Sequence, residues 1–552
     1  MPFASICRWT AAIAAAALLA ASAARLSAQA VAEVPTAAVD DVFAEWRTTT
    51  PGCAVGVSEA GEIALERAYG MADLEHDVVN TPGTIFEAGS VSKQFTAAAV
   101  LLLAREGRLS LDDPVGRYFP ELPDYGTPIT IRQMLQHTSG LRDWGSVAAI
   151  AGWRRTTRAH THAHVLDIAS RQRSLNFEPG THWSYSNTGY NLAAMLVTRV
   201  SGTSFAAFTR QRIFEPLGMT RTSWRDDYTR IVRDRAVAYA REPDGFHQDM
   251  PFENVHGNGG LLTTVGDLLR WNENFAHPTV GDGAFVHEQQ TPGRFSDGRT
   301  HGYALGLYVG RHKGVPQVAH SGSTAGYRAY LARYPDQQLS VAVLCNVGSA
   351  AAGDYAHAVA DLYLREHLQE RDGMDAVSIP SDALDARAGL YRQTLTGRPM
   401  RLTRDGSILR VDDDEPLVAL SPSRFEASDG TTFEFGDAGV RLLHPNQDWE
   451  TYEPAASATP SAGELGELAG TYTSSEAEVS LTVRVNDGVL IVERRPDTVF
   501  ELKPVYADAF DSDLGLVRFD RGADGRPTAL SVSVDRVWDL RFDRVPDSPG
   551  GM

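Results

Sequence analysis

Through most of the first 370 residues, apolar positions either recur at helical spacing or form the short runs that strands use. Two apolar runs joined by a glycine-containing turn predict an early β-hairpin, over 53–58 and 63–69. Helical periodicity predicts helices over 90–105, 187–200, 265–275 and around 355–362, with strands at 329–334 and 340–344. Because strands lie at both ends and helices between them, we expect an α+β domain whose sheet is built from its two ends.

After about residue 372 the pattern changes to short alternating segments separated by Asp-Gly turns, which is typical of all-β structure. This pattern repeats. The segment Ala388-Gly389-Leu390-Tyr391 is matched by Ala469-Gly470-Thr471-Tyr472, roughly 80 residues later. We expect two small antiparallel β-barrels, at 380–455 and 464–547, separated by the Pro/Ala/Ser-rich stretch Pro454–Gly463. Chance similarity between two β-rich stretches is the alternative.

The N-terminus has the layout of a secretory signal peptide over residues 1–30, which leaves the first domain at 31–372. Arg8 precedes an apolar run over 11–24, and Ala28-Gln29-Ala30 offers small residues for cleavage. The run is too short to span a bilayer, and an uncleaved N-terminal anchor is the alternative. No later stretch reaches the about 20 apolar residues of a membrane span. We therefore expect an exported protein, periplasmic or secreted, with no membrane span after signal removal.

Composition and charge narrow the functional classes. A chain of 552 residues predicts two to four domains, and 43% apolar with 22% charged residues is ordinary for a globular protein. A net charge of −19 argues against a general nucleic-acid or anionic-membrane binder, because a phosphate backbone would repel it. Cys53 and Cys345 lie in strand-like runs, where they either pair after export or remain inert core residues. The cluster at 160–164 of three histidines is more typical of a solvated helix start than of a metal site, so we expect no metal and no cofactor.

Three short segments carry candidate chemistry, and the first is Gly89-Ser90-Val91-Ser92-Lys93. Residues three apart share a helix face, so Ser90 and Lys93 are predicted to meet at the start of a helix. Unpaired backbone N–H groups and the positive end of the helix dipole favour a reactive hydroxyl there. Burial lowers the pKa of a lysine, which leaves a neutral amine able to take the hydroxyl proton.

The second segment is Tyr185-Ser186-Asn187, which follows a Pro-Gly turn and stands close to a helix start. Tyr185 is a candidate proton relay, and the amide of Asn187 is a candidate contact for the lysine and for a substrate carbonyl. In the third segment, His320 is followed by Ser321, Gly322 and Ser323 at the start of a strand. A glycine-spaced strand edge permits close approach, so an extended substrate is able to lie along it, with N–H groups available to an oxyanion.

The ordered triple of Ser-x-x-Lys, Tyr-x-Asn and His-x-Gly resembles the penicillin-recognising serine hydrolases. That group includes class C β-lactamases, D-Ala-D-Ala carboxypeptidases, D-aminopeptidases and related esterases. The likeness covers about residues 37–370 and extends to flanking segments, Ile85–Gly89, Leu135–Leu141 and Gly257–Leu261. It implies a five-stranded antiparallel sheet packed on helices, beside a helical subdomain, in a β-lactamase/transpeptidase-like domain. The two C-terminal barrels are most like those of D-aminopeptidases.

The resemblance implies that Ser90 is the nucleophile and Lys93 its base, with Tyr185, Asn187 and His320 completing the site. Backbone N–H groups of Ser90 and Ser323 are implied to form the oxyanion hole. Many relatives carry lysine at the position of His320, so strong dependence on a substrate carboxylate is less expected here.

We therefore expect a serine hydrolase that cleaves amide or ester bonds through an acyl-enzyme on Ser90, acting as a peptidase or amidase on small or D-amino-acid-containing peptides. A β-lactamase or carboxylesterase is the first alternative, and an inactive ligand-binding scaffold is an alternative of another class. The expected partner is a small-molecule or peptide substrate. The sequence leaves open the natural substrate, the role of the barrels, the oligomeric state and the pairing of Cys53 with Cys345.

Overall fold

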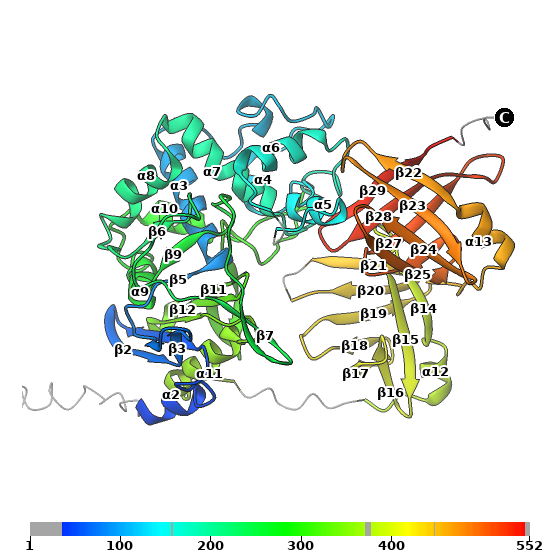
Figure 1. The fold of residues 1–552 in the computed structure, drawn as a ribbon. Coiled ribbons are helices and arrows are strands. Elements are labelled where there is room, and N and C mark those ends of the chain that lie inside the picture. The colour runs from blue at the N-terminus through cyan, green and yellow to red at the C-terminus, as the bar shows by residue number, and fades with distance from the viewer. Residues whose placement is uncertain (1–35, 156–157, 370–376, 446–447, 547–552) are drawn as a thin grey trace, which may run out of the picture.

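The protein consists of a mixed domain of helices and strands followed by two all-β units (Figure 1). The computed structural model describes residues 36–155, 158–369, 377–445 and 448–546. The expected signal peptide over 1–30 lies outside these described residues. The predicted α+β domain with two barrels is confirmed.

The first domain is built on an antiparallel sheet in the order β10-β11-β12-β13-β1-β2. Its strands come from both ends of the domain, as predicted, and are β1 (Cys53–Glu59), β2 (Glu62–Tyr69), β10 (Tyr308–His312), β11 (Val315–Thr324), β12 (Tyr327–Tyr334) and β13 (Leu339–Cys345). The expectation of five strands was wrong, because the sheet has six. The edge strand β10 is mostly half-exposed and contains Gly310, so its sequence lacks the alternation of apolar and polar residues that predicts a strand.

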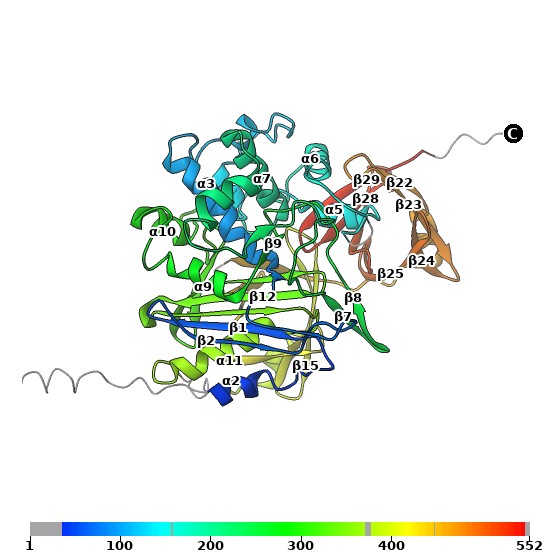
Figure 2. The ribbon, with the colours of Figure 1, turned by 60° about the vertical axis from the view of Figure 1, so that its left-hand side comes forward.

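Helices cover both faces of the sheet (Figure 2). The outer face packs on α2 (Thr36–Val42) and α11 (Ala352–Leu364), and α9 (Val265–Glu273) packs on the other face. The remaining helices are η1 (Gly89–Ser92), α3 (Lys93–Arg105), η2 (Val115–Arg117), α4 (Ile131–Leu135), α5 (Trp144–Ile150), α6 (His162–Arg171), α7 (Asn187–Ser201), α8 (Phe205–Thr209), η3 (Arg210–Phe214), α10 (Gly283–Gln290) and η4 (Pro335–Gln337). Short strands complete the domain: β3 (Met71–Asp73), β4 (Val78–Val79), β5 (Phe86–Glu87), β6 (Ser223–Trp224), β7 (Tyr239–Glu242), β8 (Gly245–Gln248) and β9 (Leu261–Thr263).

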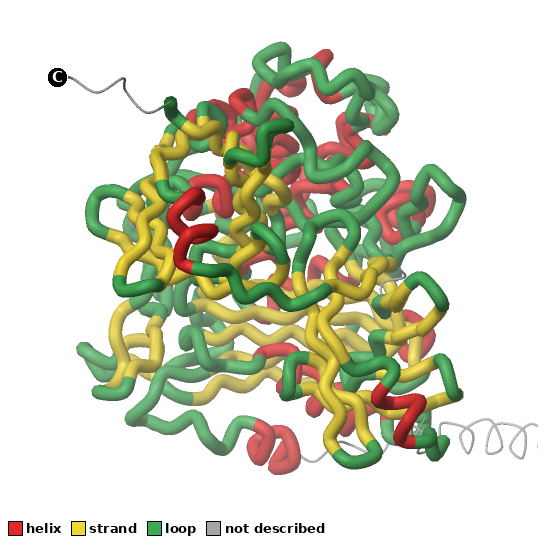
Figure 3. Tube along the Cα trace, turned by 90° about the vertical axis from the view of Figure 1, so that its right-hand side faces the viewer, coloured by secondary structure: helices red, strands yellow, loops and turns green. Residues whose placement is uncertain are grey.

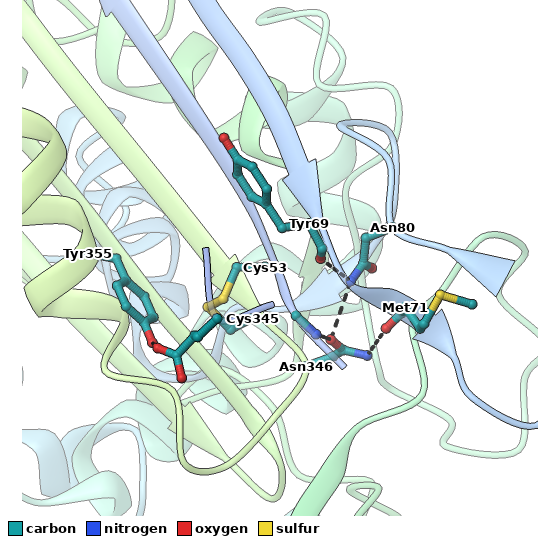
Figure 4. Close-up of a disulfide and its surroundings, with 9 residues drawn as sticks. Cys53, Tyr69, Met71, Asn80, Cys345, Asn346 and Tyr355 are labelled. Atoms are coloured by element: carbon teal, nitrogen blue, oxygen red, sulfur yellow. Dashed lines mark hydrogen bonds between the residues drawn. A yellow bond between two sulfur atoms is a disulfide. The ribbon is translucent and has the colours of Figure 1, made fainter. Parts of the chain in front are cut away.

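A disulfide joins β1 and β13, the first and the last strand of the six-stranded sheet in chain order. Cys53 of β1 lies directly opposite Cys345 of β13, with Cα atoms 4.0 Å apart, and their sulfur atoms are bonded (Figure 4). The neighbouring Asn346 accepts a hydrogen bond from the backbone N–H of Gly52 at 2.8 Å and donates to the carbonyl of Met71 at 3.0 Å. Of the two outcomes left open by the sequence, the structure therefore has the paired one.

Each C-terminal unit is a closed eight-stranded antiparallel barrel preceded by a short helix. The first comprises α12 (Ser381–Asp385) and strands β14 (Gly389–Gln393), β15 (Pro399–Asp405), β16 (Ile408–Val411), β17 (Glu415–Ser421), β18 (Arg424–Glu426), β19 (Thr432–Gly436), β20 (Gly439–Leu443) and β21 (Trp449–Ala455). The second comprises α13 (Ala462–Leu468) and strands β22 (Gly470–Ser474), β23 (Val479–Asn486), β24 (Val489–Arg494), β25 (Thr498–Tyr506), β26 (Ala509–Asp511), β27 (Leu516–Arg521), β28 (Pro527–Val534) and β29 (Val537–Arg544).

The repeat predicted from the sequence is visible in a shared contact. Tyr391 in the first barrel and Tyr472 in the second each donate a hydrogen bond to the carbonyl four residues earlier, at 2.9 and 2.8 Å. The predicted linker Pro454–Gly463 was too long. Its first two residues belong to β21 and pair with β14, and Ser461 caps α13 through a reciprocal hydrogen-bond pair with Glu464.

The second barrel docks on the helical part of the first domain (Figures 1 and 3). Apolar residues of α5 and α6, among them Trp144 and Val165, form one buried cluster with the interior of this barrel. At the same interface Arg494 of β24 donates to the carbonyls of Ala149 and Ile150 at the end of α5, at 2.7 and 2.9 Å. The barrel is therefore held against the domain by an apolar core and by helix capping.

By length and composition, none of the described helices is able to cross a membrane alone. One bent pair, Asn187–Ser201 with Phe205–Phe214, passes that test together.

Candidate active site

Ser90 stands at the junction between a buried strand and a buried helix. It belongs to η1, which follows β5 and leads directly into α3. Glu87 at the end of β5 is fully buried and accepts two hydrogen bonds from Arg225, at 2.8 and 2.9 Å. Burial alone raises the pKa of this carboxyl, but the charges of Arg225 and Arg235 hold it below its ordinary value. This ion pair anchors the strand that presents Ser90.

Backbone-to-backbone contact places η1 against β11. Gly89 has φ +50°, and a Cβ on it would lie 2.5 Å from the backbone nitrogen of Ser323. A Cβ on Gly322 would lie 2.0 Å from the carbonyl oxygen of Ala88. Only glycine fits at both positions, which explains why the serine and His-x-Gly segments each contain one.

Beside this contact, β11 presents a free edge. Strand β10 pairs with β11 only as far as Ala319, so the segment 320–324 has no strand partner on that side among the described residues. Ser321 and Ser323 are exposed on this edge and Gly322 is buried. The geometry is that of a docking edge for an extended ligand, next to the backbone N–H of Ser323.

Lys93 is completely buried, and its amine contacts three oxygen atoms. Nζ lies 3.1 Å from Oγ of Ser90, 2.9 Å from Oδ1 of Asn187 and 2.7 Å from the carbonyl oxygen of Asn258. Burial lowers the pKa of Lys93 well below its ordinary value, and the positive charge of Arg536 lowers it further, against the opposing effect of Asp143. These conditions favour a neutral amine.

Tyr185 and Asn187 come from the loop before α7 and its first turn. Asn187 is held by its backbone N–H, which donates to the carboxylate of Asp143 at 2.8 Å. The ring of Tyr185 lies 4.7 Å from Nζ of Lys93. Burial raises the pKa of Tyr185, and a hydrogen bond with Ser90 opposes that rise. The structure thus brings Ser90, Lys93, Tyr185 and Asn187 into one cluster.

His320 lies beside this cluster as a buried, neutral side chain. Its Nε2 is 3.0 Å from the hydroxyl of Tyr303 and its exposed fraction is 2%. Burial is the main cause that lowers the pKa of His320, to about 3. At neutral pH His320 therefore supplies no positive charge to the site, unlike the lysine that many relatives carry at this position.

Three further residues of the site were not among the predicted site residues: Tyr303, His137 and Asn258. Tyr303 packs against the rings of His137 and Tyr185, at centroid distances of 4.6 and 6.5 Å. His137 itself is buried beneath Tyr185, 4.3 Å away, and its Nδ1 accepts a hydrogen bond from the backbone N–H of Ser186 at 3.1 Å. His137 and Asn258 both lie within flanking segments that carried the family resemblance, whereas Tyr303 had no such signal.

A cleft of about 1360 Å³, lined by the first domain and by both barrels, reaches the cluster at Tyr185. Tyr185, His320 and Ser321 line it from the first domain. The second barrel contributes Arg536, whose guanidinium carbon is 4.7 Å from the ring centroid of Tyr185. The histidine cluster lies elsewhere, where His160, His162 and His164 contact the carbonyl of Trp153, the carbonyl of His256 and the backbone N–H of Thr161.

Comparisons with known proteins agree with this geometry. The family described as Beta-lactamase matches residues 28–364. A D-aminopeptidase of Gluconobacter oxydans is 28% identical over 455 residues, covering 80% of this chain and 83% of its own. Penicillin-binding protein 4* of Bacillus subtilis is 29% identical over 340 residues, covering 59% of this chain and 74% of its own.

Among solved structures, the octameric penicillin-binding protein homologue from Pyrococcus abyssi has the same fold. Its TM-score is 0.55 at 24% identity, over 75% of this chain and 98% of its own. The family match covers more than half of the chain and confirms the resemblance seen in the three motifs. The chain belongs to the Beta-lactamase family.

Proposed function

We propose that the protein is a serine hydrolase that forms an acyl-enzyme on Ser90, acting as a peptidase or amidase on small or D-amino-acid-containing peptides. The observation that carries the proposal is the 3.1 Å contact between Oγ of Ser90 and Nζ of Lys93 inside a buried cluster. A neutral amine has two N–H donors and one lone pair. The carbonyl oxygens of Asn187 and Asn258 take both donors, so the lone pair faces the hydroxyl of Ser90.

The reaction follows from these roles. Oγ of Ser90 attacks the carbonyl carbon of the substrate while its proton passes to Nζ of Lys93, and the oxyanion forms near the backbone N–H groups of Ser90 and Ser323. The phenol of Tyr185, kept protonated by its raised pKa, gives a proton to the leaving nitrogen as the C–N bond breaks, and recovers one from Lys93. Water then attacks the ester, releasing the acid and restoring Ser90.

The substrate class is supported by the D-aminopeptidase relative, whose likeness covers 80% of this chain. Architecture adds support, because both barrels line the cleft and leave room for a ligand of several residues.

The test combines labelling with three substrates. A fluorophosphonate probe should modify Ser90, and Ser90→Ala should abolish the adduct while keeping the unfolding curve. Wild type should cleave D-Ala-p-nitroanilide more efficiently than nitrocefin or a p-nitrophenyl ester. Efficient turnover of nitrocefin alone would favour a β-lactamase, and of the ester alone a carboxylesterase. A folded protein without any adduct would favour an inactive ligand-binding scaffold.

We also propose that the protein is exported, with residues 1–30 removed as a signal peptide. Arg8, the apolar run over 11–24 and the Ala28-Gln29-Ala30 segment support this, as does the disulfide between Cys53 and Cys345, since disulfides persist in oxidising compartments. Expression in a bacterial host should yield periplasmic or secreted protein beginning after Ala30, as read by mass spectrometry. Membrane-bound protein that retains the first thirty residues would favour an anchor.

A further inference from the structure

The hairpin turn between β28 and β29 of the second barrel reaches the site from outside the first domain. Arg536 in this turn is held by its backbone, because its carbonyl accepts hydrogen bonds from the backbone N–H of Asp143 at 3.2 Å and from Nδ2 of Asn176 at 3.1 Å. The backbone N–H of Trp538 donates to Oδ1 of Asn176 at 2.9 Å. Asp143 is the same residue that holds Asn187. The turn and the site therefore share one anchor.

A buried arginine fixes the residues that follow. Arg142 donates to the carbonyls of Trp538 and Asp539, at 3.0 and 3.2 Å, and pairs with Glu476 at 2.7 Å. Its side chain is 1% exposed. With backbone bonds on both sides, the turn holds the side chain of Arg536 in one position relative to Tyr185.

The guanidinium of Arg536 stays accessible although the backbone of the turn is held. Its side chain is 38% exposed and lines the same cleft as His320 and Ser321. Among the described residues it forms one ion pair, a contact of 3.6 Å with Asp535, whose own side chain is 83% exposed. This exposed neighbour pair contributes little, so most hydrogen-bonding capacity of the guanidinium remains for a ligand.

Of the basic groups described beside Tyr185, which are Lys93, His320 and Arg536, Arg536 is the one that presents a positive charge to the cleft. Lys93 is buried and favoured as a neutral amine, and His320, with a pKa of about 3, is neutral. The carboxylate of Asp143 accepts hydrogen bonds from the backbone of Ser146 and Asn187, at 3.0 and 2.8 Å. A guanidinium in such a place presents paired N–H donors that match a carboxylate.

We propose that Arg536 is a specificity-determining residue that binds a free carboxylate on the substrate's leaving group. The preferred substrate is then a peptide-like amide whose leaving group is an α-amino acid. This inference rests on the proposed function, in which Tyr185 protonates the leaving nitrogen. In an α-amino acid the carboxylate carbon is two bonds from that nitrogen, so a guanidinium stacked over the ring of Tyr185 is within its reach. The same charge disfavours an ammonium group at that end of the substrate.

The test compares two peptides that differ only in the terminal charge, N-acetyl-D-alanyl-D-alanine and its C-terminal amide. Wild type should show a higher kcat/KM for the acid. Measured at a pH above the acid limb of both proteins, Arg536→Gln should lower kcat/KM for the acid by about 10- to 100-fold and change that for the amide by less than about threefold. For the acid, kcat/KM of Arg536→Lys should fall between those of wild type and Arg536→Gln, because lysine keeps the charge and loses the paired donors.

Arg311→Gln is the matched control, because Arg311 also lines the cleft as an exposed arginine but donates to the carbonyl of Gly314 at the end of β10. It should leave the ratio of the two kcat/KM values unchanged. A second measurement is the protection of Ser90 from a fluorophosphonate, which the acid should provide in wild type and lose in Arg536→Gln.

Three results would overturn the inference: no preference for the acid in wild type, an equal loss for both peptides in Arg536→Gln, or no protection of Ser90 by the acid. A different failure would point to the proposed function. If the fluorophosphonate does not modify Ser90 in folded wild-type protein, the acyl-enzyme itself is refuted, and the role of Arg536 falls with it.

Discussion

Nζ of Lys93 lies 2.7 Å from the carbonyl oxygen of Asn258, a backbone acceptor that has no proton of its own to give. With Asn187 as a second acceptor, the neutral amine donates two hydrogen bonds, and its lone pair faces the hydroxyl of Ser90. The chemistry of the site therefore depends on the charge state of one buried amine.

The first prediction concerns pH. Removal of a proton from Lys93 precedes acylation, so kcat/KM should rise with pH through the pKa of Lys93, which burial and Arg536 lower. Arg536→Gln removes a positive charge, which favours the ammonium and raises that pKa. The acid limb of the pH profile, where kcat/KM rises with pH, should therefore move to higher pH. The profile is measured with an uncharged p-nitrophenyl ester. Arg311→Gln should leave it in place, and an unmoved limb in Arg536→Gln would contradict the coupling.

The second prediction concerns Asn187. Asn187→Asp puts a carboxylate 2.9 Å from Nζ of Lys93, which stabilises the ammonium and raises the pKa of Lys93. Fluorophosphonate labelling of Ser90 at pH 7 should slow by about 10- to 100-fold and recover partly at higher pH. Asn187→Ala removes the acceptor without adding charge, so it should slow labelling with less pH dependence. Equal pH profiles for the two variants would argue against a neutral Lys93.

The third prediction concerns the contact between η1 and β11. Gly322→Ala puts a Cβ 2.0 Å from the carbonyl of Ala88, so the segment carrying Ser90 must shift. The variant should lose about 1–3 kcal/mol of unfolding free energy and most of its acylation rate. Gly310→Ala in the same sheet is the control, because its Cβ would meet no atom within 4 Å. Denaturant unfolding and Ser90 labelling measure both effects, and normal acylation in Gly322→Ala would contradict the required approach.

Local spacing explains which parts of the site could be predicted from the sequence. Ser90 and Lys93 are three residues apart at a helix start, where any helix brings them side by side. Short-range patterns also predict the hairpin of β1 and β2 and the repeated barrels. An example is the Ala-Gly pair that comes shortly before Tyr391 and again before Tyr472. These elements need no knowledge of how domains pack.

Residues that depend on packing could not be predicted. Arg536 stands in an ordinary Asp-Arg turn, and its place over Tyr185 follows from the docking of the second barrel on α5. Tyr303 reaches the site from a loop without periodicity, and the edge strand β10 is too polar to be recognised. The pairing of Cys53 with Cys345 depends on the register between β1 and β13, which no local pattern encodes.

The fourth prediction concerns this disulfide. It closes a loop with a sequence separation of 292, so its removal enlarges the unfolded ensemble. The double variant Cys53→Ser with Cys345→Ser should lose about 2–5 kcal/mol of unfolding free energy and should keep its rate of Ser90 labelling, because both residues pack in the outer-face core with α2 and α11. Denaturant unfolding of the oxidised wild type beside the double variant gives the difference. Identical unfolding free energies would contradict a stabilising bond.

The fifth prediction concerns the ion pair that holds the barrel turn. Glu476→Gln leaves the guanidinium of Arg142 buried without its charge partner, which should cost about 3–5 kcal/mol of unfolding free energy. Because Arg142 also binds the carbonyls of Trp538 and Asp539, the turn should loosen, and the acid limb of ester hydrolysis should move toward that of Arg536→Gln. Glu478→Gln is the control, since Glu478 is 64% exposed and contacts Arg171 at 3.4 Å on the same segment. It should change stability by less than about 0.5 kcal/mol. If Glu476→Gln loses stability while the acid limb stays in place, Arg536 does not need this anchor to act on Lys93.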